Sequence, residues 1–326
     1  MSPRWGRGKK TPRTRVFFAT DIHGSERCFR KWLNAATVYD AQALILGGDL
    51  TGKAIVPLVR TANGWRGELY GRPVEARGDD DLKEIHDHIR TLGFYDVLVS
   101  DEEAEALKEP DYRDQVFSRV IRESVETWVD LVGRRLADLG VAVYMMLGND
   151  DHSELAKFLR QSPIITYSED QLTSLPGGYE MVSCGFSTPT PWHLEREVSE
   201  EELATMIDRQ VASLTDPEFA VFNLHNPPYG THLDQAPKLD ENLRPLVSSA
   251  GPQVESVGSH AVRSVIERVQ PMLALHGHIH ESPGSERIGR TLCINPGSDY
   301  GQGILRGALV DLDRERGVRS WQLVQG

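Results

Sequence analysis

The sequence is poor in features that mark several protein classes. Its three cysteines, Cys28, Cys184 and Cys293, are too few and too far apart for a disulfide framework or a zinc-finger pattern. No apolar run approaches the roughly 20 residues of a membrane span, and the N-terminus lacks the apolar stretch of a secretory signal. We therefore expect a cytoplasmic protein without membrane contact, whose cysteines are small buried apolar residues.

The sequence also lacks an excess of positive charge. Lys and Arg number 36 against 48 Asp and Glu, which gives a net charge of −12. Because duplex DNA is bound mainly through Lys and Arg that neutralise phosphates, this charge argues against nucleic acid as a partner, although a local basic cleft would still permit it. Residues 1–14 are basic and rich in Pro and Gly, and we expect them to form a disordered lead-in to a domain over 15–326.

Short apolar runs rich in β-branched and aromatic residues recur along the chain. They predict strands over 15–20, 42–48, 141–148, 218–224, 271–277 and 291–294. Their apolarity is continuous rather than alternating, which is typical of strands buried on both faces. Helical patterns lie between them, for example over 25–37 and 259–269. Strands that alternate with helices indicate a layered α/β fold.

The stretch between the second and third strands is longer than a connection requires. Residues 53–77 predict a hairpin with its turn at Asn63-Gly64, and helical patterns follow over 79–94 and 112–140. We read an inserted α+β segment at about 53–120, which packs beside the core in a position to cover the site.

Residues of the metal-ligand type follow five of the predicted strands. In α/β folds ligands bind beyond the carboxyl ends of the strands, and His is the commonest metal ligand. The sequence therefore predicts one shared metal site. The candidates at these strand ends include Asp21, His23, Asp49, Asn149, His225, His278 and His280. A third histidine of the segment "LALHGHIHES", His276, precedes the turn, and we interpret it as a neutral, hydrogen-bonded core residue.

Five ordered motifs, "DIHG", "GGDL", "GNDD", "LHNPP" and "GHIH", make the chain similar to the calcineurin-like metallophosphoesterases. The resemblance runs from Val16 to about Asp313, apart from the insertion. It implies a four-layer α/β/β/α sandwich and a metal-dependent phosphoric ester hydrolase with two divalent ions, Mn, Fe, Zn or Ni. A metal-bridging hydroxide would attack a small soluble phosphate ester, which we expect to be a phosphodiester.

The resemblance also implies a role for each site residue. The first cation would be held by Asp21, His23 and His280, and the second by Asn149, His225 and His278. Asp49 would bridge both, since one carboxylate has two oxygens. The residues implied in catalysis are Asp49, Asn149, Asp150 and His225.

Asp150 is a departure from the family pattern, which usually has a His there to bind the scissile phosphate. A carboxylate with its ordinary pKa of about 3.9 is ionised at neutral pH. It would repel a phosphate oxygen unless its pKa were raised or it bonded to backbone or an Arg. Other branches of the family lack this His and still cleave diesters, so we expect monoesters to suffer most. Two roles stay open for His152: it could partly replace that His, or it could be a surface residue. We expect Asp151 to cap the following helix.

Two other functions stay open at this point. A nuclease of the same fold would need a basic track, which the net charge of −12 speaks against. A non-catalytic metal-binding scaffold predicts broken ligand positions, whereas all seven are filled. The physiological substrate and the oligomeric state, including a homo-oligomer, are not fixed by these patterns.

Overall fold

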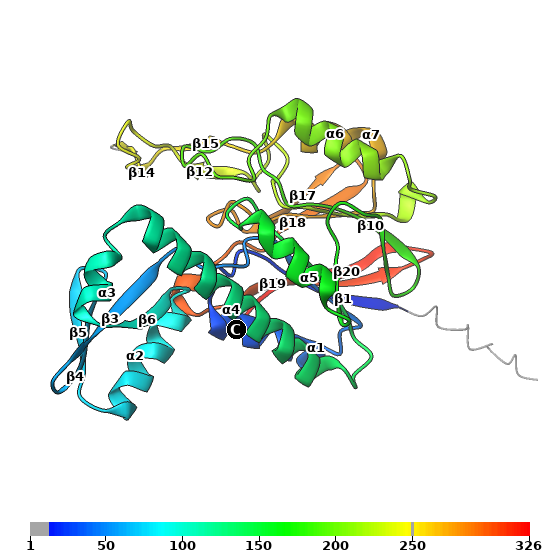
Figure 1. The fold of residues 1–326 in the computed structure, drawn as a ribbon. Helices are drawn as coiled ribbons and strands as arrows, with labels where there is room; N and C mark the ends of the chain where they lie inside the picture. The colour runs from blue at the N-terminus through cyan, green and yellow to red at the C-terminus, as the bar shows by residue number, and fades with distance from the viewer. Residues whose placement is uncertain (1–12, 249–250) are drawn as a thin grey trace, which may run out of the picture.

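A computed structural model describes residues 13–248 and 251–326. The predicted lead-in therefore lies outside the described residues except for its last two positions, and Thr14 already belongs to the first strand. Two six-stranded sheets form the body of the molecule (Figure 1). The first has the order β20 (Gly317–Gln325), β19 (Arg306–Asp313), β1 (Thr14–Ala19), β2 (Ala43–Gly47), β7 (Ala142–Met146) and β8 (Ile165–Tyr167). The second has the order β17 (Gly284–Ile288), β18 (Thr291–Asn295), β16 (Leu273–Leu275), β11 (Val221–Leu224), β10 (Tyr179–Cys184) and β9 (Thr173–Leu175).

The two sheets pack face to face, because one buried cluster contains side chains of both. Phe18 and Ile45 of the first sheet lie in it with Val221 and Leu273 of the second. The outer face of the first sheet is covered by α1 (Glu26–Val38), α4 (Pro110–Leu136) and α5 (Ala156–Gln161), and that of the second by α6 (Glu200–Val211) and α7 (His260–Val269). The predicted four-layer α/β/β/α sandwich is confirmed.

Both sheets have a parallel centre. β1, β2, β7 and β8 run parallel in the first sheet, and β10, β11, β16 and β18 in the second. The predicted strands are almost wholly buried, as their continuous apolarity indicated. Since carboxyl ends of parallel strands share one edge, the loops that follow them meet at the same rim of the sandwich.

A separate small sheet lies between β2 and α4. Its order is β5 (Arg72–Ala76), β4 (Gly64–Leu69), β3 (Ile55–Thr61) and β6 (Tyr95–Val99), with α2 (Asp79–Thr91) and α3 (Asp101–Ala106) beside it. It has its own cluster of buried apolar residues, which includes Leu58 and Ile89. We call residues 53–106 the inserted lobe. The long helix α4 that follows packs instead into the main core.

The hairpin turn of this lobe lies one residue earlier than predicted. Thr61 pairs with Gly64, so Ala62 and Asn63 form the turn. Gly64 is already a strand residue with φ +141°, and a Cβ there would lie 1.9 Å from the carbonyl oxygen of Ala76. This glycine is therefore required by the neighbouring strand rather than by the turn.

The remaining elements are short. An arm built from β12 (Gln235–Pro237), β13 (Val247–Ser248), β14 (Gly251–Pro252) and β15 (Val254–Ser256) projects beside the second sheet. Three 3-10 helices are η1 (Ser153–Leu155), η2 (Pro217–Phe219) and η3 (Tyr300–Gln302). All three cysteines are free and buried, as predicted. Among the described residues, no helix is long and apolar enough to span a membrane.

Candidate metal centre

The predicted ligands lie on tight turns at the carboxyl ends of the strands. Asp21, His23, Asp49 and His278 have φ values of 52°, 39°, 50° and 67°. This left-handed backbone costs an L-residue about 1–2 kcal/mol. Hydrogen bonds between the turns hold it in place: the amides of Asp21 and His23 donate to the carbonyls of Gly48 and Asp49, each at 3.0 Å. The turns after β1 and β2 therefore form one rigid unit.

The structure brings all seven predicted ligands together in two groups. In the first group, ligand atoms of Asp21, His23, Asp49 and His280 lie within 4.8 Å of one another. The second group contains Asp49, His225 and His278. Asn149 joins it, since its Oδ1 lies 2.8 Å from His278 Nδ1. Asp49 is common to both groups, which is the position of a bridging carboxylate.

The donor atoms of these groups fit divalent cations. His23 Nε2 and His280 Nε2 face each other at 3.1 Å. His225 Nε2 is buried without a hydrogen-bond partner among the described residues and lies 3.4 Å from Asp49 Oδ2. Buried polar atoms normally have partners, and imidazole with carboxylate suits first-row divalent metals. His225 Nδ1 donates to the carbonyl of Gly47 at 2.8 Å, which orients Nε2 toward Asp49.

The carboxylates of Asp21 and Asp49 give the centre a negative field, which favours positive charge next to them. Burial alone would raise the pKa of Asp49, but the neighbouring His225 outweighs it, and the pKa lies well below its ordinary value. Burial opposes protonation of His225, yet the carboxylates of Asp49 and Asp21 raise its pKa to about 9. Asp49 is therefore ionised at neutral pH and supplies the negative charge that a cation site requires.

The layered topology and the order of the ligand-bearing turns decide the fold. The chain has the four-layer fold that its resemblance to the calcineurin-like metallophosphoesterases implies. One solved structure matches 96% of this chain and 99% of its own at 18% identity, with a TM-score of 0.55. TT1561 of Thermus thermophilus is 14% identical and covers 96% of this chain and 98% of its own, with a TM-score of 0.50. At these identities the likeness concerns the fold alone.

The sequence comparisons add a distant relative. An uncharacterized protein of Methanocaldococcus jannaschii, MJ1162, is 28% identical over 167 residues, which are 50% of this chain and 67% of that protein. No protein-family model matches the chain.

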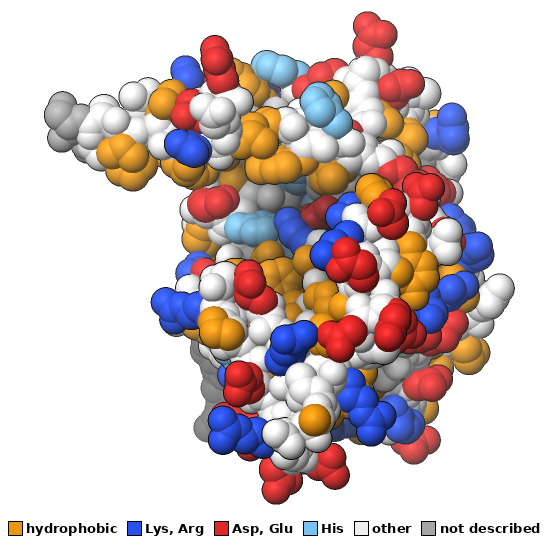
Figure 2. Space-filling model, turned by 60° about the vertical axis from the view of Figure 1, so that its left-hand side comes forward, with side chains coloured by type: hydrophobic (Ala, Val, Ile, Leu, Met, Phe, Trp, Pro, Cys, Tyr) orange, Lys and Arg blue, Asp and Glu red, His pale blue; other side chains and the backbone are white. Residues whose placement is uncertain are grey.

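The predicted ligands are mostly buried, but two of them reach the surface. Figure 2 shows a hollow between the projecting arm and the rest of the molecule, with histidine and Lys or Arg side chains in it. Most ligands are buried to at least 95%, whereas His278 and His280 are partly exposed. A ligand from solution would therefore approach the centre on the side of these two histidines.

Asp150 has a partner that the sequence analysis did not name. Its Oδ2 lies 2.8 Å from Lys53 Nζ and 3.5 Å from His23 Nδ1. Its backbone amide donates to Asp49 Oδ1 at 3.0 Å. Burial and the charge of Asp49 raise the pKa of Asp150 to about 6, although Lys53 acts in the opposite direction. The pKa of Asp150 is therefore raised, and the partner of its carboxylate is Lys53 rather than the expected backbone or Arg group.

The prediction that Asp151 caps a helix is wrong. Its carboxylate accepts hydrogen bonds from the amides of Gly148, Leu50 and Thr51 at 2.8–2.9 Å, and from the Thr51 hydroxyl at 2.7 Å. The 3-10 helix that follows begins only at Ser153. Asp151 is buried and links the turn after β7 to the turn after β2. It does so because amides of both turns donate hydrogen bonds to its carboxylate.

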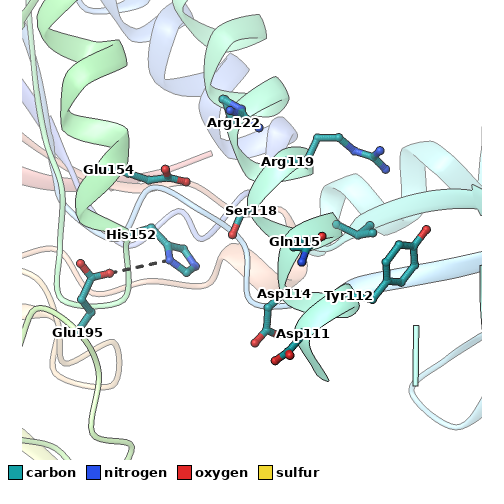
Figure 3. A pocket seen from close by; sticks show the side chains of 11 residues that line it. Asp111, Tyr112, Asp114, Gln115, Ser118, Arg119, Arg122, His152, Glu154 and Glu195 are labelled. Atoms are coloured by element: carbon teal, nitrogen blue, oxygen red, sulfur yellow. Dashed lines mark ion pairs between the residues drawn. The ribbon is translucent and has the colours of Figure 1, made fainter. Parts of the chain in front are cut away.

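His152 belongs to a different cavity. Its Nδ1 lies 3.9 Å from Glu195 Oε2, and its ring packs on the edge of Phe117. Figure 3 shows the pair across from the first half of α4, which contributes residues such as Tyr112 and Arg119. None of the seven predicted ligands lines this cavity. Of the two roles left open for His152, the surface role agrees with this position.

His276 is the core residue that the sequence predicted. Its side chain is fully buried, and its Nδ1 donates to the carbonyl of Leu224 at 2.8 Å. Burial lowers its pKa to about 4, so the ring is neutral at physiological pH. It braces β16 against β11, next to the two histidines that face the centre.

A buried ion pair beneath the Asn149 turn was not found from the sequence. Arg196 donates through Nε to the carbonyl of Gly148 at 2.8 Å, and its terminal nitrogen contacts both oxygens of Glu169 at 2.6 and 2.7 Å. Glu169 also accepts from the amide of Gly185 at 2.8 Å. The pair positions the turn that carries Asn149. Its members sit in two separate loops, and neither loop shows a motif.

Replacement of Arg196 by Met is expected to lower the free energy of unfolding by about 3–5 kcal/mol, because it leaves the Glu169 carboxylate buried without its partner. The matched control is Arg66→Met, which breaks a largely exposed pair with Asp101 and should cost less than about 1 kcal/mol. Urea unfolding of both variants measures the difference. Equal losses would show that the buried pair is not the main support of this turn.

The inserted lobe is anchored directly to the ligand turns. A Cβ at Gly52 would lie 2.0 Å from the carbonyl oxygen of Gly93, and one at Gly93 would lie 2.1 Å from the carbonyl oxygen of His23. The Gly52 amide also donates to the Tyr95 hydroxyl at 2.8 Å. We call Gly24, Gly52 and Gly93 the glycine contact, since their backbones touch where the lobe meets both turns.

Proposed function

We propose that this chain is a metal-dependent phosphoesterase, and that its substrate is a small soluble phosphodiester. The observation that carries the proposal is the pair of ligand groups that share Asp49. Such a site fits two divalent ions, with Mn, Fe, Zn and Ni as candidates. When bound, paired divalent ions supply Lewis-acid chemistry, which polarises phosphate oxygens and makes water acidic enough to attack at neutral pH.

The chain's own residues would divide the remaining work. Asp49 would hold both ions at a fixed separation, and the Asn149 amide and His225 would complete the second ion's ligands. Asp21 and His23 would orient the first ion, with His280 on its partly exposed side. Hydrogen bonds between the turns keep these groups in position before any ligand arrives, so little reorganisation would be needed.

The preference for a diester follows from the charge next to the ligands. Asp150 and Lys53 form an ion pair whose net charge is zero, where the family usually has a His that can bind phosphate. A monoester dianion gains less from such a neutral pair than it would from a protonated His, whereas a diester has only one negative charge to accommodate. The net charge of −12 supports a small substrate over a nucleic acid.

Metal-restored hydrolysis tests this function. The protein would be stripped with chelator and given Mn, Ni, Zn or Mg in turn, with bis(p-nitrophenyl) phosphate and p-nitrophenyl phosphate as substrates. We expect cleavage to return with metal and to be faster for the diester. Two ions bound by elemental analysis without cleavage of either ester would instead favour a non-catalytic metal-binding module. The cytoplasmic location and a homo-oligomer stay predictions.

A further inference from the structure

Lys53 is placed at the metal centre by a rigid loop. The residues just before it are fixed on two sides: the Thr51 amide donates to Asp151 Oδ1, and the Gly52 amide donates to the Tyr95 hydroxyl. The Lys53 ammonium lies 2.8 Å from Asp150 Oδ2, and the side chain remains 47% exposed. An ammonium has three N–H donors. Asp150 accepts from one of them, and the exposure of the side chain leaves the others open to a ligand from solution.

The charge of Lys53 acts on the pKa values of nearby predicted ligands. Together with burial, it lowers the pKa of His23, and it also helps to lower the pKa of Asp49. Lys53 therefore places a positive charge next to the predicted ligands, since its partner Asp150 lies 3.5 Å from His23 Nδ1.

We propose that Lys53 is a substrate-binding residue whose ammonium donates a hydrogen bond to a non-bridging oxygen of the scissile phosphate. Asp150 is its positioning residue, which holds the flexible side chain at the centre and does not itself contact the substrate. The inference rests on the proposed function and deepens it. Lys53 takes over the phosphate contact that the residue at position 150 cannot make as a carboxylate.

The test compares Lys53→Met with Lys108→Met. Met keeps the apolar stem and removes the charge, and Lys108 is a matched control because its pair with Glu105 is exposed. Because the variant loses a hydrogen bond between charged groups, we expect KM for bis(p-nitrophenyl) phosphate to rise at least about tenfold in Lys53→Met, with a smaller change in kcat. Calorimetric titration of metal-loaded protein with inorganic phosphate should show a similar rise in Kd. Lys108→Met should change neither quantity.

A double-mutant cycle tests the role of Asp150. Asp150→Asn should raise KM about threefold or more in the wild-type background and have no further effect in the Lys53→Met background. An undiminished effect there would overturn the positioning role. Unchanged KM and phosphate Kd in Lys53→Met would overturn the binding role, as would loss of bound metal in that variant.

The outcomes also separate this inference from the proposed function. If the wild-type protein cleaves the diester and Lys53→Met has the same KM and phosphate Kd, only the inference is refuted. A metal-loaded wild-type protein that cleaves no ester but binds phosphate through Lys53 refutes only the proposed catalysis. If the metal-loaded wild-type protein neither cleaves an ester nor binds phosphate, both the inference and the proposed function are refuted.

Discussion

Replacement of Asp49 by Asn is expected to abolish hydrolysis and the pairing of metal ions together. Asp49 is the residue common to both ligand groups, and an amide has one oxygen where the carboxylate has two. Its backbone also occupies a left-handed turn that bonds to the turn of His23. We expect kcat/KM for bis(p-nitrophenyl) phosphate to fall at least about a thousandfold, with fewer than two ions per chain by elemental analysis.

The control for this variant is Asp216→Asn. Asp216 is a partly exposed carboxylate whose ion pair with Arg314 lies outside both ligand groups. It should retain wild-type activity and metal content. Full activity of Asp49→Asn with one ion lost would overturn the bridging assignment, because one ion would then suffice for the reaction.

The second large effect is expected at the glycine contact, from Gly93→Ala. Gly93 has φ +82°, and a Cβ there would lie 2.1 Å from the carbonyl oxygen of His23, which cannot move without displacing a metal ligand. The variant should lose about 3 kcal/mol or more of unfolding free energy. Urea unfolding and metal titration measure both consequences, and we expect weaker metal binding as well.

Gly71→Ala separates the two contributions to this loss. Gly71 lies in the same inserted lobe with φ +74°, but nothing lies within 4 Å of its Cβ position. It should therefore show only the backbone cost of about 1–2 kcal/mol and unchanged metal binding. If both variants lost the same free energy of unfolding, the close approach of the lobe to His23 would contribute nothing to the loss in Gly93→Ala.

The fold and the ligand set could be predicted because their signals are local. Each buried strand is a continuous apolar run, and each ligand follows such a run within a few residues, as Asp21 follows β1 and His225 follows β11. Parallel strands then bring these ends to one rim without further information. The grouping of the ligands around Asp49 rested on the family resemblance, and the structure places the side chains in the same two groups.

The partners of these ligands could not be predicted because they depend on contacts between distant loops. Lys53 and Asp150 are far apart in the chain and meet only when the turns after β2 and β7 lie side by side. The same holds for the Asp151 carboxylate, whose preceding strand and following helix suggested a cap rather than a tie to Leu50. Sequence patterns report which residues share an element, whereas these pairs are set by how elements dock.

The left-handed backbone at Asp21, His23, Asp49 and His278 has a consequence for how this chain can change. Glycine would relieve about 1–2 kcal/mol of backbone strain at each of these positions. At Asp21 and Asp49 it would also remove carboxylates that accept hydrogen bonds from the amides of His278 and Asp150. We therefore expect stabilising substitutions of this protein to lie outside these four positions. The metal site requires these side chains, so the backbone strain at the rim of the sheets is retained.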